Sequence, residues 1–570
     1  MPSGDSQSEP ATVAAQRNVG WLLRAAAEQW PDRMAVAMPD GRGADGKRKY
    51  RTITFGELDR LTDRIASGLA GHGVTPGTRL ALLVPQSIEF VALVFALFKA
   101  GTVQILIDPG MGRKNMIRCL AEAEPEGIIG IPAAQFVSWL LGRRFPKLKH
   151  RVTVGRPRFP GSSSLDSIAQ SEVSGEAIAA VGDATDAAII FTTGSTGPPK
   201  GVLYTHGTFR GQAQQIRDFY GIRPGEIDLP GFPLFALFNA AMGVSTVIPE
   251  MDPTRPADID PRAFIEIATD WQVTQSFGSP ALWNTVGRYC EKQSGRQLPT
   301  IRRVLSAGAP VPPHVLARVL STIAPQGEMH TPYGATEALP VASNSAAEVL
   351  GETQARSADG AGTCVGHRFP GIAWRVIAID DGPIDSIERT TSVPTGEIGE
   401  LMVSGSVVTR RYVTRVDANA LHKVRDGQIV WHRMGDVGYL DDQDRFWFCG
   451  RKAHRVITAD GTLFTIPCEA IANGDEAIYR SALVGVGPVG KRTPVLVLEP
   501  WPEQWPGSRA ARQALLERVA RRLANHRLTT GIRHLLLRRR LPVDIRHNSK
   551  IFRERLAPWA EARLGRAFRF

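Results

Sequence analysis

Cysteine is scarce in this chain, with five residues in 570, and no C-x-x-C pair occurs. The five stand far apart, at positions 119, 290, 364, 449 and 468. An odd and scattered set argues against a disulfide framework and against a cysteine zinc site. The twelve histidines are dispersed as well, without an H-x-x-x-H or H-x-H cluster. Together these absences predict a protein of the reducing cytoplasm.

Long apolar runs are lacking too. Residues 1–16 are polar and do not have the charged start and apolar core of a secretory signal peptide, so we expect a disordered tail over residues 1–17. Residues 90–98 are uninterruptedly apolar, but Glu89 and Lys99 flank them. Because this run is too short to span a bilayer, it predicts a buried helix in a soluble protein.

The net charge of +12 is confined to one end of the chain. Residues 507–570 hold 17 Lys/Arg against 4 Asp/Glu, whereas the other residues hold 51 against 52. The basic segment also carries Leu515, Val519 and Leu523 at helical spacing, which predicts a folded helix rather than a disordered arm. We expect it to face an anionic partner, a lipid surface or an acidic protein. Nucleic acid is disfavoured, because neither aromatic interleaving nor a known binding module is present.

Strand-like and helical stretches alternate along the first part of the chain, which predicts parallel α/β layers. Later strand-like runs are separated by turns, which indicates a β-rich subdomain. The length favours several folding units. We place the main boundary at Gly450-Arg451, with a large domain over residues 18–450 and a small α+β domain over residues 451–570. The predicted strands lie at residues 80–84, 103–107, 127–130, 188–191, 243–248, 275–278, 304–306, 374–379, 400–403, 481–486 and 495–498.

Residues 191–201, FTTGSTGPPKG, form the most informative stretch. They follow a buried-strand pattern, and their glycines, hydroxyls and lysine suit a loop that holds phosphate through backbone N–H groups and a point charge. The spacing is not that of a Walker loop, because Lys200 follows proline and precedes Gly201. The sequence therefore predicts a phosphate site of another type.

Three further strings complete a possible nucleotide site. Residues 333–337, YGATE, offer an aromatic face for a base, a hydroxyl for phosphate and a carboxylate for Mg²⁺. Asp436 stands in MGDVGY, where we expect a tight turn that lets the acid accept ribose hydroxyls. Lys550 follows a polar turn near the C-terminus. Alone, each of these residues has an ordinary structural explanation, and only their combination indicates a site.

In this order the motifs resemble those of the adenylate-forming superfamily, which includes acyl-CoA synthetases, luciferase-like enzymes and peptide-synthetase adenylation domains. The resemblance extends over roughly residues 20–560. It implies a large N-terminal domain of three subdomains, a small mobile C-terminal domain, and adenylation of a carboxylate with ATP and Mg²⁺. It also implies the nucleotide contacts, which involve Thr192, Thr193, Gly194, Ser195, Thr196, Gly197, Lys200, Gly308, Ala309, Pro310, Tyr333, Gly334, Asp436 and Arg451.

The same resemblance implies individual roles. Residues 192–200 would hold the pyrophosphate, Tyr333 would stack on adenine, and residues 306–310 would lie beside it. Thr336 would contact the α-phosphate, and Glu337 would bind Mg²⁺. Asp436 and Arg451 would hold the ribose, and Lys550 would bridge the substrate carboxylate and the α-phosphate.

Three departures from the family pattern bear on the second half-reaction. Ser549 replaces the usual glycine before the catalytic lysine, His454 stands at the hinge position, and Ala236 replaces a histidine common in acyl-CoA synthetases. The nucleotide motifs are intact, so these changes question thioester formation rather than adenylation.

Four longer strings are similar to those of one branch, the olefin-biosynthesis β-lactone synthetases; they lie at residues 249–256, 277–282, 360–366 and 542–548. That resemblance implies a long-chain, α-alkyl β-hydroxy acid as substrate and other enzymes of the hydrocarbon pathway as possible partners. Phe232, Phe235, Ala236 and Phe277 would line the acyl tunnel, although such a run is core by default. A long-chain acyl-CoA synthetase or acyl-AMP ligase is the alternative, and a non-catalytic adenylation fold is disfavoured because no motif residue is missing.

His206 remains open between two interpretations. Thr205 before it predicts a helix cap, which makes His206 a helix-start residue. It is also a candidate base for the acyl chemistry, because histidine is the most common general base.

Overall fold

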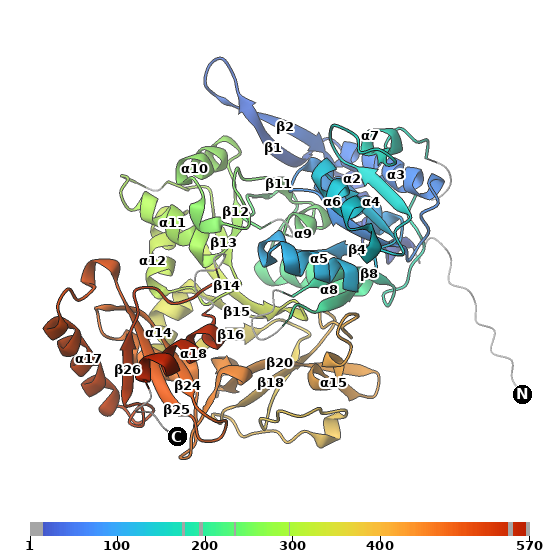
Figure 1. The fold of residues 1–570 in the computed structure, drawn as a ribbon. Helices are drawn as coiled ribbons and strands as arrows, with labels where there is room; N and C mark the ends of the chain where they lie inside the picture. The colour runs from blue at the N-terminus through green and yellow to red at the C-terminus, as the bar shows by residue number, and fades with distance from the viewer. Residues whose placement is uncertain are drawn as a thin grey trace, which may run out of the picture.

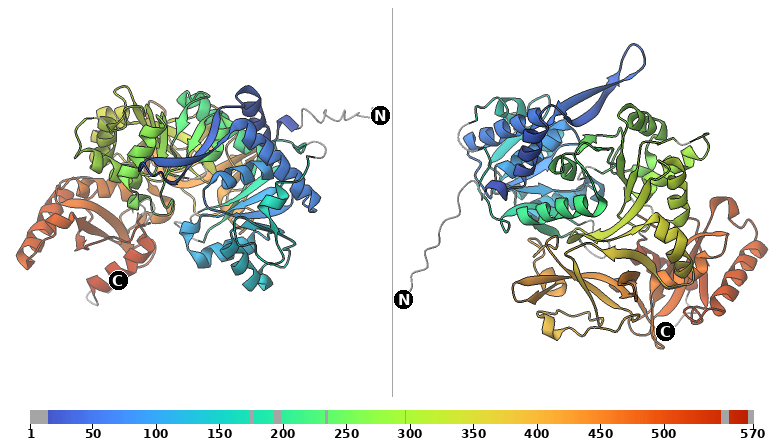
Figure 2. Two further views of the ribbon diagram at one scale, coloured as in Figure 1. Left: turned by 90° about the horizontal axis from the view of Figure 1, so that it is seen from above. Right: turned by 180° about the vertical axis from the view of Figure 1, so that it is seen from behind.

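The computed structural model describes residues 15–173, 177–192, 198–232, 235–295, 297–544 and 551–565. These residues form two large sheets and two small ones. In Figure 1 the N-terminal lobe, coloured blue to teal, lies at upper right, and the C-terminal elements, orange to red, lie at lower left. Figure 2 shows the same separation from two further sides.

The first large sheet has seven strands in the order β7-β6-β5-β3-β4-β8-β9. Every neighbouring pair is parallel except β8 and β9, which are antiparallel. The strands are β3 (Arg79–Leu83), β4 (Val103–Leu106), β5 (Gly127–Gly130), β6 (His150–Thr153), β7 (Ser163–Ser164), β8 (Asp186–Phe191) and β9 (Gly201–Thr205). The accompanying helices are α2 (Gly20–Gln29), α3 (Phe55–Gly71), α4 (Ile88–Lys99), α5 (Arg113–Glu122), α6 (Pro132–Leu140), α7 (Leu165–Ile168) and α8 (His206–Tyr220).

The second sheet has fourteen strands, and its character changes along its width. From β11 to β14 its neighbours are parallel, and from β14 to β17 they are antiparallel. The strands are β1 (Met34–Arg42), β2 (Arg48–Thr54), β10 (Ile227–Asp228), β11 (Ser245–Val247), β12 (Gln275–Gly278), β13 (Arg303–Ser306), β14 (Glu328–Ala335), β15 (Ala338–Ser345), β16 (Thr363–Arg368), β17 (Ala373–Ile377), β18 (Gly399–Ser404), β19 (Lys423–Asp426), β20 (Ile429–Leu440) and β21 (Arg445–Arg451). The helices of this part include α9 (Phe235–Ala241), α10 (Pro261–Asp270), α11 (Pro280–Cys290), α12 (Pro313–Thr322), α13 (Ala346–Glu348), α14 (Gln354–Ala358) and α15 (Ala418–His422).

The chain after β21 forms separate small sheets around an apolar core of its own, which includes Leu483, Leu496, Leu515 and Val519. Its elements are β22 (Val456–Ile457), β23 (Thr462–Leu463), α16 (Thr465–Asn473), β24 (Ile478–Val486), β25 (Thr493–Pro500), α17 (Arg509–Ala524), β26 (His534–Leu537) and α18 (Arg553–Leu564). The basic segment thus contains a folded helix, α17, as predicted, and it buries Leu515, Val519 and Leu523.

The apolar run before Lys99 is a buried helix, as predicted. Ser87 caps α4 by accepting a hydrogen bond from Phe90 N at 3.1 Å, and the helix is apolar on all sides because it is buried throughout. Lys99 at its end is fully buried, and its Nζ lies 2.6 Å from Asp63 Oδ1. Asp59 contacts the same Nζ, so the charge of the buried lysine is compensated.

The prediction of an α/β protein with a β-rich part is confirmed, and the strands predicted at 127–130 and 275–278 have those bounds in β5 and β12. Ala15, within the tail predicted over residues 1–17, is buried, and residues 1–14 lie outside the described residues. All five cysteines are described, buried and free. No described helix is long and apolar enough to cross a membrane.

A buried ion network joins the β-rich part to the residues that follow β21. Glu400 on β18 and Arg433 on β20 are both fully buried, and Arg433 Nη2 lies 2.6 Å from Glu400 Oε2. Lys452, the residue after β21, places Nζ 3.0 Å from the same oxygen and 2.8 Å from the carbonyl oxygen of Asp380. One carboxylate therefore compensates two cations at the point where the chain leaves the large sheet.

Glu400→Gln should destabilise the protein by about 3–5 kcal/mol, because it leaves Arg433 and Lys452 without a buried counter-charge while preserving shape. The midpoint of thermal or urea unfolding measures this effect. Glu397→Gln is the matched control, since Glu397 is exposed three residues away. Equal midpoints for the two variants would contradict the role given to the network.

Candidate active site

The predicted phosphate loop connects two antiparallel strands, β8 and β9. Thr192 closes its base: its N–H donates to the Lys200 carbonyl oxygen at 3.0 Å, and its Oγ1 accepts from Lys200 N at 3.1 Å. Gly201 N donates to Thr414 Oγ1 at 2.7 Å, which joins the loop to the segment before α15. Thr193, Gly194, Ser195, Thr196 and Gly197 lie outside the described residues. The described ends place Lys200 beside the β-rich part of the molecule.

Tyr333, Asp436 and Arg451 meet although they come from three strands. The Tyr333 hydroxyl on β14 donates to Asp436 Oδ2, and Arg451 Nη1 on β21 lies 2.9 Å from Asp436 Oδ1. Burial, together with the Asp436 charge, raises the pKa of Tyr333 well above its usual value, so its hydroxyl stays protonated and donates. The arrangement presents a buried, oriented carboxylate next to an aromatic ring.

The tight turn predicted at Asp436 is wrong, because Asp436 lies inside the long strand β20. Its placement comes from a bulge: β18 advances two residues between Glu400 and Met402, while β20 advances four between Val437 and Arg433. Gly435 within this bulge has φ of +67°, a conformation that favours glycine. A bulge re-aims a side chain without ending the strand, and here it brings Asp436 to Tyr333 and Arg451.

Glu337 lies in the connection between β14 and β15, and its carboxylate is held by a residue that the sequence did not single out. The hydroxyl of Tyr412, which is buried, donates to Glu337 Oε1 at 2.7 Å. Thr409 fixes the backbone here, since its N–H and its Oγ1 each donate to the Glu337 carbonyl oxygen at 2.9 Å. The Thr336 carbonyl oxygen accepts from the Tyr204 hydroxyl. The Glu337 carboxylate and the carbonyl oxygens of Thr336 and Glu337 thus each accept a hydrogen bond from a neighbouring side chain.

Two lysines surround the same tyrosine. Lys200 Nζ lies 4.8 Å from the centre of the Tyr412 ring, and Lys423 Nζ lies 5.5 Å from it. Lys423 also donates to Thr409 Oγ1 at 3.2 Å. Burial lowers the pKa of Lys423 to about 7 and lowers the pKa of Lys200, while the Glu337 charge opposes both shifts. The Glu337 carboxylate is thus one negative charge near two buried lysines. A further anion would stabilise the charged forms of Lys200 and Lys423.

His422 contacts Lys200 and immediately precedes Lys423. Its Nε2 accepts from Lys200 Nζ at 3.3 Å, and burial beside Lys200 lowers its pKa to about 4. The ring is therefore neutral at pH 7 and acts as an acceptor that aims Lys200. Tyr412, Lys423 and His422 were not predicted as site residues, because nothing in sequence spacing shows that the start of β9, the β14–β15 connection and β19 converge on one point.

The other predicted site residues are more dispersed. Gly308, Ala309 and Pro310 follow the end of β13, where Gly308 has φ of +93°. The rings of Phe232 and Phe277 lie 6.4 Å apart, whereas the side chains of Phe235 and Ala236 and all of Lys550 lie outside the described residues. Gly334 stays within β14 next to Tyr333. Their roles remain predictions.

His206 is the first residue of α8 and is packed inside the protein. Thr205 caps α8 as predicted, accepting from Thr208 N at 3.2 Å. His206 is fully buried, accepts a hydrogen bond from Val19 N at 3.1 Å and packs edge-on against Phe98. Burial lowers its pKa to about 4. These contacts are with the N-terminal lobe and not with the Glu337 cluster, by which we mean Glu337, Tyr412, Lys200, Lys423 and His422.

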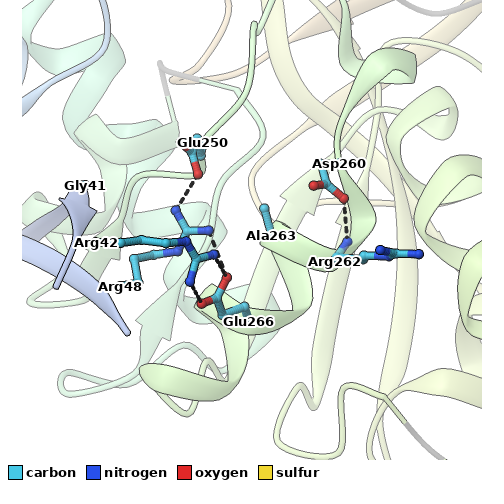
Figure 3. Close-up of a pocket in the computed structure, with 8 residues that line it drawn as sticks. All are labelled: Gly41, Arg42, Arg48, Glu250, Asp260, Arg262, Ala263 and Glu266. Atoms are coloured by element: carbon cyan, nitrogen blue, oxygen red, sulfur yellow. Dashed lines mark hydrogen bonds and ion pairs between the residues drawn. The ribbon is translucent and has the colours of Figure 1, made fainter. Parts of the chain in front are cut away.

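A cavity of about 440 Å³ lies elsewhere, between the β1–β2 hairpin and α10 (Figure 3). Arg42 and Arg48 face Glu266 across it, with Arg42 Nη2 2.6 Å from Glu266 Oε2 and Arg48 Nη2 2.9 Å from the same oxygen. Four of its charged side chains, those of Arg42, Arg48, Glu250 and Glu266, already pair with one another, and it contains no predicted site residue. We therefore take the Glu337 cluster as the candidate site.

The family of AMP-binding enzymes matches residues 23–413, well over half of the chain. The chain belongs to this family. It is 45% identical over 555 residues to an olefin beta-lactone synthetase of Stenotrophomonas maltophilia, covering 96% of this chain and 98% of that protein. It is 44% identical over 551 residues to an olefin beta-lactone synthetase of Xanthomonas campestris, covering 95% and 97%. Among solved structures, the anthranilate CoA ligase AuaEII in complex with anthranoyl-AMP matches with a TM-score of 0.76 and 18% identity, over 96% of this chain and 98% of that one.

The cluster of this AMP-binding enzyme fits ATP with Mg²⁺. The described residues contain no group of three or more acidic, cysteine or histidine side chains that could hold a metal alone. Mg²⁺ usually binds through one or two carboxylates together with substrate phosphates, which matches the single carboxylate of Glu337. Lys200 and Lys423 lie near this carboxylate, and Asp436 is paired with Arg451, so the arrangement agrees with the contacts predicted for phosphate and ribose.

Tyr412→Phe should weaken Mg²⁺-dependent ATP binding roughly tenfold, because a lost charge-assisted hydrogen bond of about 1.5 kcal/mol leaves the Glu337 carboxylate less well oriented. Isothermal titration with ATP, with and without Mg²⁺, measures the effect. Tyr479→Phe, on β24, is the control. An unchanged dependence on Mg²⁺ in Tyr412→Phe would contradict the assignment of Glu337.

Lys423 should make stability depend on pH. Its folded pKa of about 7 lies below the ordinary value of 10.5, so between these values the unfolded chain binds more protons than the folded one. The destabilisation is full below pH 7 and is relieved as the pH rises. Relative to Lys423→Met, wild-type stability should therefore increase with pH from 7 toward 10, by at most about 1.4 kcal/mol per pH unit. Urea unfolding of both proteins across this range provides the measurement. Lys49→Met, at an exposed site, should show no such trend, and a flat difference for Lys423→Met would refute the shift.

Proposed function

We propose that the protein is an ATP-dependent β-lactone synthetase that acts on a long-chain β-hydroxy carboxylic acid with an α-alkyl branch. The single observation that carries the proposal is the 45% identity, over 96% of the chain, to a protein named olefin beta-lactone synthetase. The arrangement around Glu337 supports the adenylation step, and the sequence strings shared with that branch support the lactone step.

In the first half-reaction a carboxylate oxygen of the substrate attacks the α-phosphorus of ATP. A P–O bond forms to give the acyl-adenylate, and the bond to the β-phosphate breaks to release pyrophosphate. Two anions must approach each other, so positive charge has to offset their repulsion in the transition state. Lys200 and Lys423 lie within 6 Å of the Tyr412 ring that holds Glu337, and they place this charge in a buried setting. Bound at Glu337, Mg²⁺ would neutralise phosphate charge.

In the second half-reaction the β-hydroxyl oxygen attacks the acyl carbon of the same molecule. The new C–O bond closes a four-membered lactone, the acyl–phosphate bond breaks, AMP leaves, and the hydroxyl proton is released. The overall products are β-lactone, AMP and pyrophosphate. An internal nucleophile has a high effective concentration, which helps to offset ring strain and makes CoA unnecessary.

We further propose that Lys550 reaches the reacting carboxylate as part of a mobile C-terminal domain that starts at Arg451. The arrangement of the sheets supports this boundary, because the strands after β21 form small sheets of their own around a separate core. For the substrate side we propose that Phe232, Phe235 and Phe277 line the acyl site, with Ala236 leaving room for the branched chain. We propose the cytoplasm as the location, and other enzymes of the hydrocarbon pathway as partners of the basic C-terminal segment.

Incubation of the enzyme with ATP, Mg²⁺ and a long-chain α-alkyl β-hydroxy acid, without CoA, should give equimolar AMP and β-lactone. Mass spectrometry and proton NMR of the extracted lipid measure the product. A strict requirement for CoA, with a thioester as the product, would establish the alternative acyl-CoA synthetase. Release of a free acyl-adenylate would establish an acyl-AMP ligase.

Two controls separate the half-reactions. A matched acid that lacks the β-hydroxyl should still support pyrophosphate exchange into ATP but should give no lactone. Lys550→Ala should lower that exchange at least about a hundredfold, in the range of a lost transition-state charge contact. Retained exchange in Lys550→Ala would remove the lysine from the mechanism without removing the lactone assignment.

A further inference from the structure

The helix α6 in the N-terminal lobe (Figure 1) is inverted relative to a normal surface helix. Its buried residues are polar, Gln135 and Ser138. Its apolar side chains face outward instead, and the exposed fractions are 52% for Phe136, 60% for Trp139 and 65% for Leu140. Val137 is exposed as well. Four of the nine exposed large hydrophobic residues among those described thus lie on one helix of nine residues.

Both side chains on the buried side of α6 make hydrogen bonds. Gln135 Nε2 donates to the carbonyl oxygens of Ile128 at 3.0 Å and Val152 at 2.8 Å, on β5 and β6. Ser138 Oγ donates to the Gln135 carbonyl oxygen and accepts from Arg151 Nη1 at 2.6 Å. These contacts attach the helix to the sheet through polar groups. The outward apolar residues are therefore not needed to hold the helix in place.

The exposed face continues beyond the helix. The Trp139 ring lies 6.1 Å from Phe136 and 6.5 Å from Phe159, which extends the aromatic surface to the segment after β6. Residues 141–160 contain seven Lys/Arg and no Asp/Glu. Within that segment the exposed basic residues are Arg143, Arg144, Lys147, Lys149, Arg156 and Arg158. Lys147 pairs with Glu124 at 2.8 Å.

This combination, the α6 patch, consists of the four exposed apolar residues of α6 and the basic residues of 141–160. Exposed contiguous apolar groups on a soluble fold mark a contact surface. Large apolar side chains beside Lys and Arg match the boundary of an anionic bilayer, where the rings and aliphatic chains enter the headgroup region and the cations remain with the phosphates.

A second copy of the chain fits the patch poorly. A two-fold interface would place the same basic residues opposite one another, with no acidic residue from this segment to compensate them. Four side chains on a short helix also cover little of the roughly 800 Å² per partner that a stable dimer buries. Nucleic acid suits only part of the patch, because two of its four exposed apolar side chains, Val137 and Leu140, are aliphatic and offer no ring on which a base could stack.

We propose that the α6 patch docks the enzyme peripherally on an anionic membrane surface, with Trp139 and Leu140 inserted at the level of the headgroups. The proposal depends on the patch alone and holds whichever acyl product the enzyme makes. It also differs from docking through the basic C-terminal segment. In that segment several arginines already have partners: Arg518 Nε lies 2.5 Å from Asp475, Arg553 Nη2 lies 2.6 Å from Glu469, and Arg538 lies over the Trp559 ring.

The test is flotation of the full-length protein with vesicles of phosphatidylcholine alone or with about one third phosphatidylglycerol. Wild type should float with the anionic vesicles, and more at low than at high salt. Trp139→Ser/Leu140→Ser and, separately, Arg143→Glu/Arg144→Glu should each bind roughly tenfold more weakly or worse. Trp139→Phe/Leu140→Met should retain binding. Val489→Ser is the control for an exposed apolar residue, and Arg509→Glu/Arg521→Glu is the charge-matched control on α17.

Three results would overturn the proposal. Wild type could fail to float with anionic vesicles. The Trp139/Leu140 serine variant could float as well as wild type. The α17 variant could lose binding while the Arg143/Arg144 variant retains it, which would assign docking to the C-terminal segment. Sedimentation equilibrium adds a check, since conversion of a dimer to a monomer by the serine variant, without vesicle binding by wild type, would make α6 a protein interface. ATP binding by each variant verifies the fold.

Discussion

The proposed active site depends on one buried carboxylate, Glu337, which accepts a hydrogen bond from Tyr412 and lies near two lysines. Tyr412 donates to one carboxylate oxygen, Thr409 fixes the backbone, and Lys200 and Lys423 lie on the Tyr412 ring. Burial lowers the pKa of both lysines, so an additional anion stabilises their charged forms. In the function we propose, a Mg²⁺-bound polyphosphate would supply that anion. The cluster joins both large sheets, because Lys200 precedes β9 of the seven-stranded sheet and Lys423 begins β19 of the fourteen-stranded sheet.

The sequence predicted the architecture well where local patterns determine it. A short apolar run located β5, and the apolar run before Lys99 located α4, because a segment that is buried on all sides has to be apolar throughout. Asp436 was assigned to the right cluster and the wrong local structure. Glycine before aspartate is common to turns and to bulges, and only the pairing of β18 with β20 distinguishes the two.

Tyr412, His422 and Lys423 escaped prediction for a different reason. Each is unremarkable in its own segment, and its role arises from a crossing between β9, the β14–β15 connection and β19 that has no periodic signal. A lysine at the start of a strand is expected to be exposed, whereas Lys423 is buried against the Tyr412 ring. Which distant segments meet depends on the order of the strands in the sheets, and local sequence patterns do not show that order.

The inverted helix also bears on how the N-terminal lobe is stabilised. A surface helix normally gains most of its stability by burying an apolar stripe. In α6 the buried side is Gln135 and Ser138, and their hydrogen bonds with Ile128, Val152 and Arg151 replace that stripe. Each hydrogen bond from the buried Gln135 amide to β5 or β6 adds only about 1 kcal/mol to the free energy of unfolding. These bonds therefore fix the orientation of the helix more than they stabilise the lobe. An orientation fixed in this way keeps Trp139 and Leu140 in water. The fold does not require these two side chains to be exposed. We therefore attribute their exposed position to contact with a membrane surface, which would remove them from water.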